Sequence, residues 1–298
     1  MRNVKNESNL WDIYSKVKMK ALKYPLPPPI DNRMVFVNNE LDLSEIDVYG
    51  FDYDYTLAIY RKSLNSAIYE MALKRMVSGF KMDAFCNIQK GTAHRQFRVY
   101  WPDTGKLAWE KVTKIDRGII YAGGNLEDFL QLSGIGNKGV LYFGDHVSYD
   151  LAEPTRRVGW RIAAIVPELT KEIRIQNSEE YRRKLLWLQV LTSLIDEQCS
   201  EEAEKSVQMR EILRNWCAER QRARDELEIF LNPHFGSIFR CYHNPSYFLM
   251  RLLRVTDVYM AKVTSLLQYD IEHTFFASRW PLPHEADLCH PAHFLKHL

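Results

Sequence analysis

The octapeptide GFDYDYTL, residues 50–57, determines how the chain is expected to fold. It follows the short apolar run 46–49, whose residues favour a β-strand. Asp52 and Asp54, two residues apart at the end of that strand, form a compact acidic site. One carboxylate can attack a phosphorus atom and share a Mg²⁺ ion, and the other can pass a proton to the leaving group. The Thr56 hydroxyl can fasten the loop by a hydrogen bond.

A second acidic loop follows the continuous apolar run 140–143, which is typical of a strand buried on both faces. This loop begins at Gly144 and contains Asp145 and Asp150. In an open α/β sheet, ligands bind outside the carboxyl ends of the strands. We therefore expect Asp52, Asp54 and Asp145 to meet at one edge of the sheet.

Mg²⁺ takes oxygen ligands, usually one or two carboxylates together with water and phosphate. The sequence therefore predicts one Mg²⁺ ion held by Asp52, Asp54 and Asp145, with Asp150 orienting the loop and its ligands. Two plainer readings stay open: Asp145 as a helix N-cap, and Asp150 as a solvated acidic residue.

The two acidic loops resemble the first and fourth motifs of the haloacid dehalogenase superfamily. GFDYDYTLA at 50–58, VLYFGDHVSYDLA at 140–152 and GWRIAAIVPEL at 159–169 are similar to the 5′-nucleotidase domain-containing proteins, relatives of the cytosolic purine 5′-nucleotidase. The tail supports this with FGSIFR at 235–240, NPSYF at 244–248 and DVYMA at 257–261. The resemblance covers the chain from about residue 36 to about residue 285.

The resemblance implies a haloacid dehalogenase-like, Rossmann-type parallel sheet. It implies that Asp52 is the nucleophile that forms an aspartyl-phosphate, and that Asp54 is the general acid and base with its backbone carbonyl on the metal. Asp145 would be the third protein contact to Mg²⁺, and Asp150 and Thr56 would support the loops. The implied substrates are nucleoside 5′-monophosphates or other small phosphomonoesters.

Two further motifs of such enzymes are not found between residues 57 and 139: a strand ending in Thr or Ser, and a Lys that stabilises charge during phosphoryl transfer. The available candidates read as ordinary surface residues: Thr92, Thr113, Lys106, Lys114 and Lys138. The sequence predicts that the family's central part is absent near 92–97 and that the sheet is truncated. The alternative function is therefore a catalytically silent member that acts as a binding or scaffold protein.

The chain divides into three predicted regions: an extended leader over 1–35, an α/β domain over 36–169 without cap and middle strands, and a mostly helical C-terminal region over 170–298. Helices are expected over 64–80, after the N-cap Asn125, within 168–231, and over 246–269. An apolar face is formed by Leu185, Leu188, Leu191, Thr192 and Ile195. We expect this face to pack on its own domain, and self-association through these helices is the alternative.

Composition narrows the function classes. A net charge of +2 argues for neither nucleic acid nor membrane as a partner, and no stretch reaches the length of a membrane helix. The five scattered cysteines fit reduced intracellular thiols, which favours a cytoplasmic location with a mitochondrial one as the alternative. A helical interaction module, with the α/β part as a platform only, is the third hypothesis.

Overall fold

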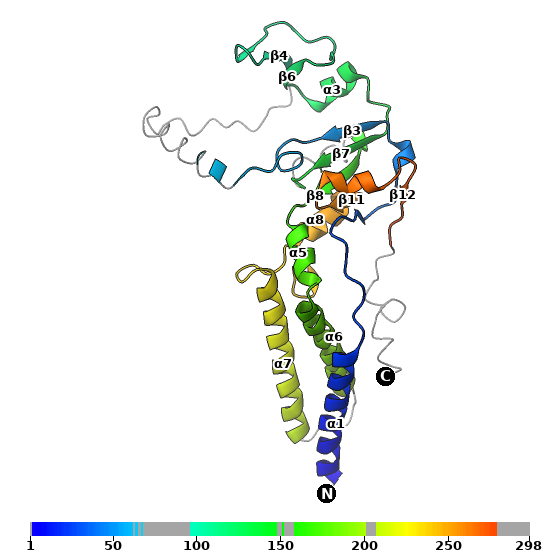
Figure 1. Cartoon of the computed structure of the whole chain (residues 1–298), viewed down its shortest axis with the longest axis vertical. Helices are drawn as coiled ribbons and strands as arrows, with labels where there is room; N and C mark the ends of the chain where they lie inside the picture. Colours follow the sequence, from blue (N-terminus) through cyan, green and yellow to red (C-terminus); the bar gives the residue numbers. More distant parts are fainter. Residues whose placement is uncertain are drawn as a thin grey trace. The chain divides into compact units, whose positions relative to one another are not determined.

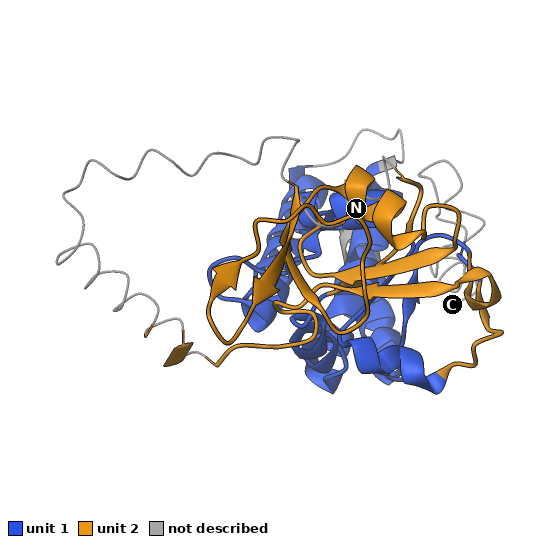
Figure 2. Ribbon diagram, turned by 90° about the horizontal axis from the view of Figure 1, so that it is seen from above, with its two compact units in different colours: residues 1–40, 166–268, 276–298 blue, residues 41–165, 269–275 orange. Residues whose placement is uncertain are grey.

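The computed structural model describes residues 2–61, 63, 64, 67, 96–147, 151, 158–200 and 207–278. The chain forms two compact units, shown in different colours in Figure 2. Unit 1 contains residues 1–40, 166–268 and 276–298, and unit 2 contains residues 41–165 and 269–275. The predicted three-region division therefore differs from this grouping, since the N-terminal residues belong with the C-terminal helices.

Unit 2 is built on three parallel strands: β3 (Val48–Phe51), β7 (Val140–Gly144) and β8 (Arg161–Ile165). Strand β7 lies between the other two, with Val48 opposite Val140 and Leu141 opposite Arg161. Leu141 and Phe143 are fully buried, as expected for an apolar central strand. The predicted α/β class is confirmed, and the parallel strands are consistent with a haloacid dehalogenase-like fold.

A smaller antiparallel sheet of unit 2 contains β4 (Phe97–Trp101), β5 (Lys106–Leu107) and β6 (Ile120–Gly123), labelled in part in Figure 1. A turn at residues 102–105 joins β4 to β5. Helix α3 (Leu126–Ser133) follows, and the side chain of Asn125 accepts a hydrogen bond from the Asp128 N–H, so the predicted N-cap is confirmed. Unit 2 also holds η1 (Leu43–Glu45) and the antiparallel pair of β2 (Leu41–Asp42) and β12 (Thr274–Phe275).

Unit 1 contains the predicted long helices as α5 (Leu169–Gln176), α6 (Glu179–Ser200) and α7 (Val207–Leu231). The expected apolar face of α6 packs within its own unit. Leu191 is fully buried in a cluster with Trp216, and Leu188 packs against a second cluster around Tyr181. No helix within the described ranges is long and apolar enough to cross a membrane.

The leader is not extended over its first part, because residues Arg2–Lys23 form helix α1, which runs alongside α6 in Figure 1. Leu10 is buried in the same cluster as Leu191, and the Tyr14 ring stacks on Trp216 with centroids 5.6 Å apart. The apolar residues of α1 are sparse, and their pattern alone is a weak indication of a helix. Packing on other helices stabilises it, as for most protein helices. The proline-rich segment 25–30 that follows contains no helix or strand.

A polar network joins α1, α6 and α7. The Tyr14 hydroxyl donates a hydrogen bond to Glu219 Oε2 at 2.6 Å, and Lys18 Nζ lies 3.0 Å from Glu219 Oε1. The indole N–H of Trp187 donates to the same Oε1 at 3.0 Å. Lys18 Nζ also lies over the Trp187 ring, 4.9 Å from its centroid. These directional contacts fix the register of α1 against its neighbours, which apolar packing alone does less strictly.

The last predicted helix, 246–269, is too long. Helix α8 spans Tyr247–Val255, and β11 (Val258–Met260) then pairs antiparallel with β1 (Phe36–Val37). Thr256 leaves the helix in an extended conformation, and its neighbours Val258 and Met260 become fully buried. Burial and strand pairing therefore override the helical pattern here. Before α8, the short strands β9 (Arg240–Cys241) and β10 (Asn244–Pro245) pair with each other. After β11 comes the 3-10 helix η3 (Val263–Gln268).

Glu172 on α5 gives a prediction about stability and pH. Its side chain is buried and accepts a hydrogen bond from the Ser237 hydroxyl. Burial raises the pKa of Glu172, although hydrogen bonds from Ser237 and the Ile238 backbone act to lower it. The folded state thus holds this proton more tightly than the unfolded state. The contribution of protonated Glu172 to the free energy of unfolding is present below the pKa that Glu172 has in the unfolded state. It is lost as the pH rises through the pKa that Glu172 has in the folded state.

We expect Glu172→Gln to become progressively more stable than the wild type as the pH rises from about 4 to about 8. Urea unfolding of both proteins across this range measures the difference. Glu180→Gln, which changes an exposed carboxylate on α6, is the control and should show no such trend. Parallel stability curves for Glu172→Gln and the wild type would contradict this reading of Glu172.

Candidate active site

Asp52 and Asp145 lie at the same end of two adjacent parallel strands. Asp52 directly follows β3, and its backbone N–H donates to the Phe143 carbonyl at 2.8 Å, so the ladder with β7 continues one residue past the strand. Asp145 directly follows Gly144, the last residue of β7. Both side chains are partly exposed. The structure therefore brings the backbones of the two predicted acidic loops together at the carboxyl edge of the sheet.

Asp54 lies on a tight loop that its own backbone closes. The Leu57 and Ala58 N–H groups donate to the Tyr53 carbonyl, both at 3.0 Å, and Tyr55 adopts a left-handed conformation with φ 55°. Asp54 is exposed, and its Oδ1 accepts a hydrogen bond from the Tyr60 hydroxyl. This bond raises the pKa of Tyr60. An exposed carboxylate with one positioned donor is chemically suited to exchange a proton with a bound molecule.

Tyr60 is a site residue that the sequence did not indicate. It reaches Asp54 only because the chain reverses at residues 53–58, and no spacing pattern connects the two positions. Such a contact depends on the conformation of the loop, which the presence of a tyrosine at this position does not indicate.

Thr56 is buried beside this loop, with 7% of its surface exposed. Its Oγ1 makes no hydrogen bond within the described part of the chain. The backbone bonds to Tyr53 close the loop instead. The loop-fastening role of the hydroxyl therefore stays a prediction, and Asp150 lies outside the described residues.

The donor chemistry fits Mg²⁺, since the carboxylates of Asp52, Asp54 and Asp145 and the neighbouring backbone carbonyls are all oxygen ligands. Two of these residues stand at adjacent strand ends, as a shared ion requires. However, no three His, Cys, Asp or Glu side chains gather at metal-binding distance among the residues that the structure describes. The shared metal ion stays a prediction.

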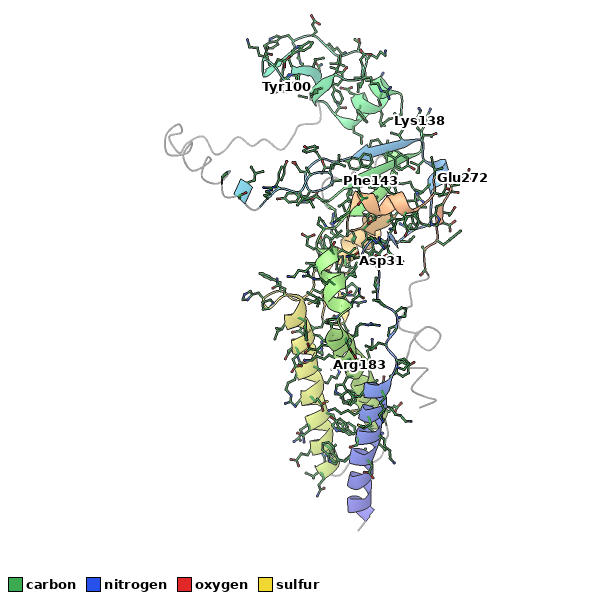
Figure 3. All side chains as sticks on the ribbon, viewed as in Figure 1. Asp31, Tyr100, Lys138, Phe143, Arg183 and Glu272 are labelled. Carbon is green, nitrogen blue, oxygen red and sulfur yellow. The ribbon has the colours of Figure 1, made fainter. Side chains whose placement is uncertain are left out.

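The structure also places most of the candidate phosphate-stabilising residues. Lys138 precedes the first residue of β7, whereas Asp145 follows the last, and a strand of 5 residues spans about 16 Å. Figure 3 labels Lys138 and Phe143 toward the two ends of this strand. Lys114 forms an ion pair with Asp116 at 3.0 Å. Lys106 and Thr113 are exposed, and Thr92 lies outside the described residues.

Parallel strands that carry two acidic residues after one strand and a third after its neighbour define an α/β protein with a carboxylate site at the strand ends. The model of the 5′ nucleotidase family matches residues 35–87 and 89–287, and the chain belongs to this family. The resemblance inferred from the sequence is thereby confirmed. The two matched segments meet at residue 88, close to the junction expected near 92–97. The absence of the family's central part stays a prediction.

Named relatives agree with this assignment. The 5′-nucleotidase domain-containing protein 2 of Rattus norvegicus is 46% identical over 187 residues, which cover 62% of this chain and 33% of the rat protein. The Homo sapiens protein of the same name is also 46% identical over 187 residues, covering 35% of its length. A 5′-nucleotidase domain-containing protein of Dictyostelium discoideum is 36% identical over 194 residues, covering 65% of this chain and 32% of its own. The chain thus spans about a third of the length of the curated relatives it matches.

Proposed function

We propose that this chain is a Mg²⁺-dependent phosphohydrolase of the 5′-nucleotidase type, which acts on nucleoside 5′-monophosphates or other small phosphomonoesters. One observation carries the proposal. Asp52 and Asp54 follow β3, and Asp145 follows the adjacent parallel strand β7, in a member of the 5′ nucleotidase family. This is the edge of an α/β sheet at which ligands bind.

Asp52 has the role of the nucleophile. Its carboxylate oxygen attacks phosphorus and forms an aspartyl-phosphate, while the bond from phosphorus to the ester oxygen breaks. Asp54 donates a proton to the departing alcohol and then takes a proton from the water that hydrolyses the aspartyl-phosphate. The Tyr60 hydroxyl holds the Asp54 carboxylate in position during both transfers.

Asp52, Asp145 and the backbone carbonyl of Asp54 would hold Mg²⁺. The ion would neutralise charge on the phosphoryl oxygens. Lys138 lies beyond the opposite end of β7 from Asp145 and cannot share this task, and losing one preorganised donor lowers a rate by roughly 10²–10³. Turnover by this chain should therefore lie well below ~10 s⁻¹, the median for enzymes.

The test is phosphate release from purine and pyrimidine nucleoside monophosphates, with Mg²⁺ and with a chelator. We expect slow release that requires Mg²⁺. Asp103→Asn, in the turn between β4 and β5, is the control and should keep the wild-type rate. Release that is equally fast in the presence of the chelator would refute the Mg²⁺ requirement.

The second candidate is a catalytically silent protein that binds nucleotides or serves as a scaffold. The placement of Lys138 at the opposite end of β7 from Asp145 favours it, because this lysine is then too far from the carboxylates to stabilise a bound phosphate. Calorimetric titration with a nucleoside monophosphate separates the two candidates. Binding without any phosphate release identifies the silent protein.

A further inference from the structure

The short hairpin of β9 and β10 holds a tyrosine in an unusual backbone conformation. Cys241 pairs with Asn244, so Tyr242 and His243 form a two-residue turn. Tyr242 has a φ of 58°, in the left-handed region where such turns normally carry Gly, Asn or Asp. A bulky side chain is unfavourable there, and residues kept in such conformations concentrate at functional sites. A tyrosine at this position therefore indicates a role beyond closing the turn.

The Tyr242 ring positions an arginine of helix α7. The Arg224 guanidinium lies over this ring, 4.6 Å from its centroid, and Arg224 Nη2 lies 3.5 Å from His243 Nδ1. The Tyr242 N–H donates to Glu228 Oε1 at 3.2 Å, which holds the turn against α7. Stacking on the ring restricts the guanidinium and leaves most of its five N–H donors available to a ligand.

A second arginine contacts the same turn. Arg240 Nη1 donates to the His243 carbonyl at 3.2 Å. Within the described part of the chain, neither Arg224 nor Arg240 forms an ion pair with a carboxylate. Glu228 offsets one of the two charges, and residues 229–256 contain three Arg, two His and no Asp or Glu. The turn therefore carries two guanidinium groups beside one histidine, with an excess of positive charge.

The surroundings of the turn indicate which kind of molecule would bring an anion to it. Phe235 is 86% exposed and Tyr247 is 70% exposed. A Cβ atom at Gly236 would lie 3.5 Å from the Glu228 Cβ, so Phe235 stands close to the turn. Small-molecule sites are concave, whereas exposed aromatic and Arg side chains are typical of protein interfaces. Two guanidinium groups match the double charge and three oxygens of a phosphate group better than a single carboxylate.

We propose that the turn formed by Tyr242 and His243 binds a phosphorylated polypeptide segment. Arg224 and Arg240 donate hydrogen bonds to the phosphate oxygens, and Phe235 contacts apolar residues beside the phosphorylated one. The stacking of Arg224 on Tyr242 keeps its planar guanidinium ready for a bidentate contact. The site lies outside the two acidic loops, so it does not depend on the proposed phosphohydrolase activity.

Fluorescence anisotropy with the complete chain tests the proposal. The probe is a labelled peptide of about nine residues with a central phosphoserine between Leu and Phe residues. A chelator is present, so that the Mg²⁺-dependent site does not contribute. We expect saturable binding that weakens as salt is added, and at least about tenfold weaker binding of the unphosphorylated peptide.

Two arginine variants test the assigned contact. Arg224→Lys keeps the charge but loses the planar group, and it should lower the affinity about tenfold. Arg222→Lys changes an exposed arginine of the same helix and is the control, which should bind like the wild type. No binding of the phosphorylated peptide, equal binding of both peptides, or equal affinities of the two variants would overturn the proposal.

Tyr242→Gly separates ligand binding from a purely structural role of the ring. Glycine adopts a positive φ without steric cost, so urea unfolding should show a variant no less stable than the wild type. We expect this variant to bind the phosphorylated peptide at least about tenfold more weakly, because Arg224 loses the ring on which it stacks. Lower stability with unchanged binding would show that the ring serves only the hairpin. Adenosine monophosphate that competes as strongly as the unlabelled phosphopeptide would assign the turn to a small molecule and refute the proposed occupant.

Discussion

Gly139→Ala is expected to destabilise the parallel sheet by about 4 kcal/mol, at the upper end of single substitutions. A Cβ atom at this position would lie 1.9 Å from the Glu45 carbonyl oxygen, which belongs to the backbone and cannot rotate away. The Gly139 carbonyl accepts hydrogen bonds from the Asp47 and Val48 N–H groups at 2.9 and 3.0 Å, and its own N–H donates to Asp47 Oδ2. Any shift that relieves the clash breaks the bonds that begin the pairing of β3 with β7.

Urea unfolding followed by circular dichroism measures this loss. Gly136→Ala is the matched control three residues earlier, since its Cβ would meet only the Leu130 Cβ at 4.0 Å. We expect the control to stay within about 0.5 kcal/mol of the wild type. A Gly139→Ala protein as stable as this control would show that the approach of β7 to Glu45 is not a constraint on the fold.

Asp52→Asn is expected to abolish phosphate release, because a neutral amide is a poor nucleophile toward phosphorus. Asp54→Asn should slow release by roughly 10²–10⁴-fold, the usual contribution of general acid–base catalysis. The two substitutions differ in kind, since the first removes the attacking group and the second removes a proton donor that water can replace slowly.

Single-turnover assays with excess protein measure both variants even when turnover is slow. Trapping of an acyl phosphate in the wild type and in Asp54→Asn, but not in Asp52→Asn, would assign the covalent step. Circular dichroism confirms that each variant is folded. Full activity of Asp52→Asn would place the nucleophile elsewhere in the chain.

The parts of the fold that could be predicted are those that residues adjacent in the sequence indicate by themselves. Val140–Phe143 is a continuous apolar run and becomes the buried strand β7. Asn125 before an apolar-periodic segment becomes a helix N-cap. The positions of Asp52 and Asp145 at adjacent strand ends follow from the same rule, since each follows a predicted strand and parallel strands align their carboxyl ends.

The parts that could not be predicted depend on distant partners. Helix α1 owes its conformation to packing on α6 and α7, and β11 forms because β1 pairs with it. The Tyr60 contact to Asp54 requires a chain reversal that composition does not reveal. Each case is a tertiary interaction that outweighs a weak or opposite local preference.

The network around Glu219 has a consequence for biosynthesis. Tyr14 and Glu219 are separated by 205 positions, and α1 cannot gain this partner until α7 has been translated. At ordinary rates of synthesis this interval lasts roughly 10–40 s. During that time Leu10, Trp11 and Tyr14 of the nascent chain remain without their packing partners on α7. Folding of unit 1 is therefore expected to finish only after α7 has been translated.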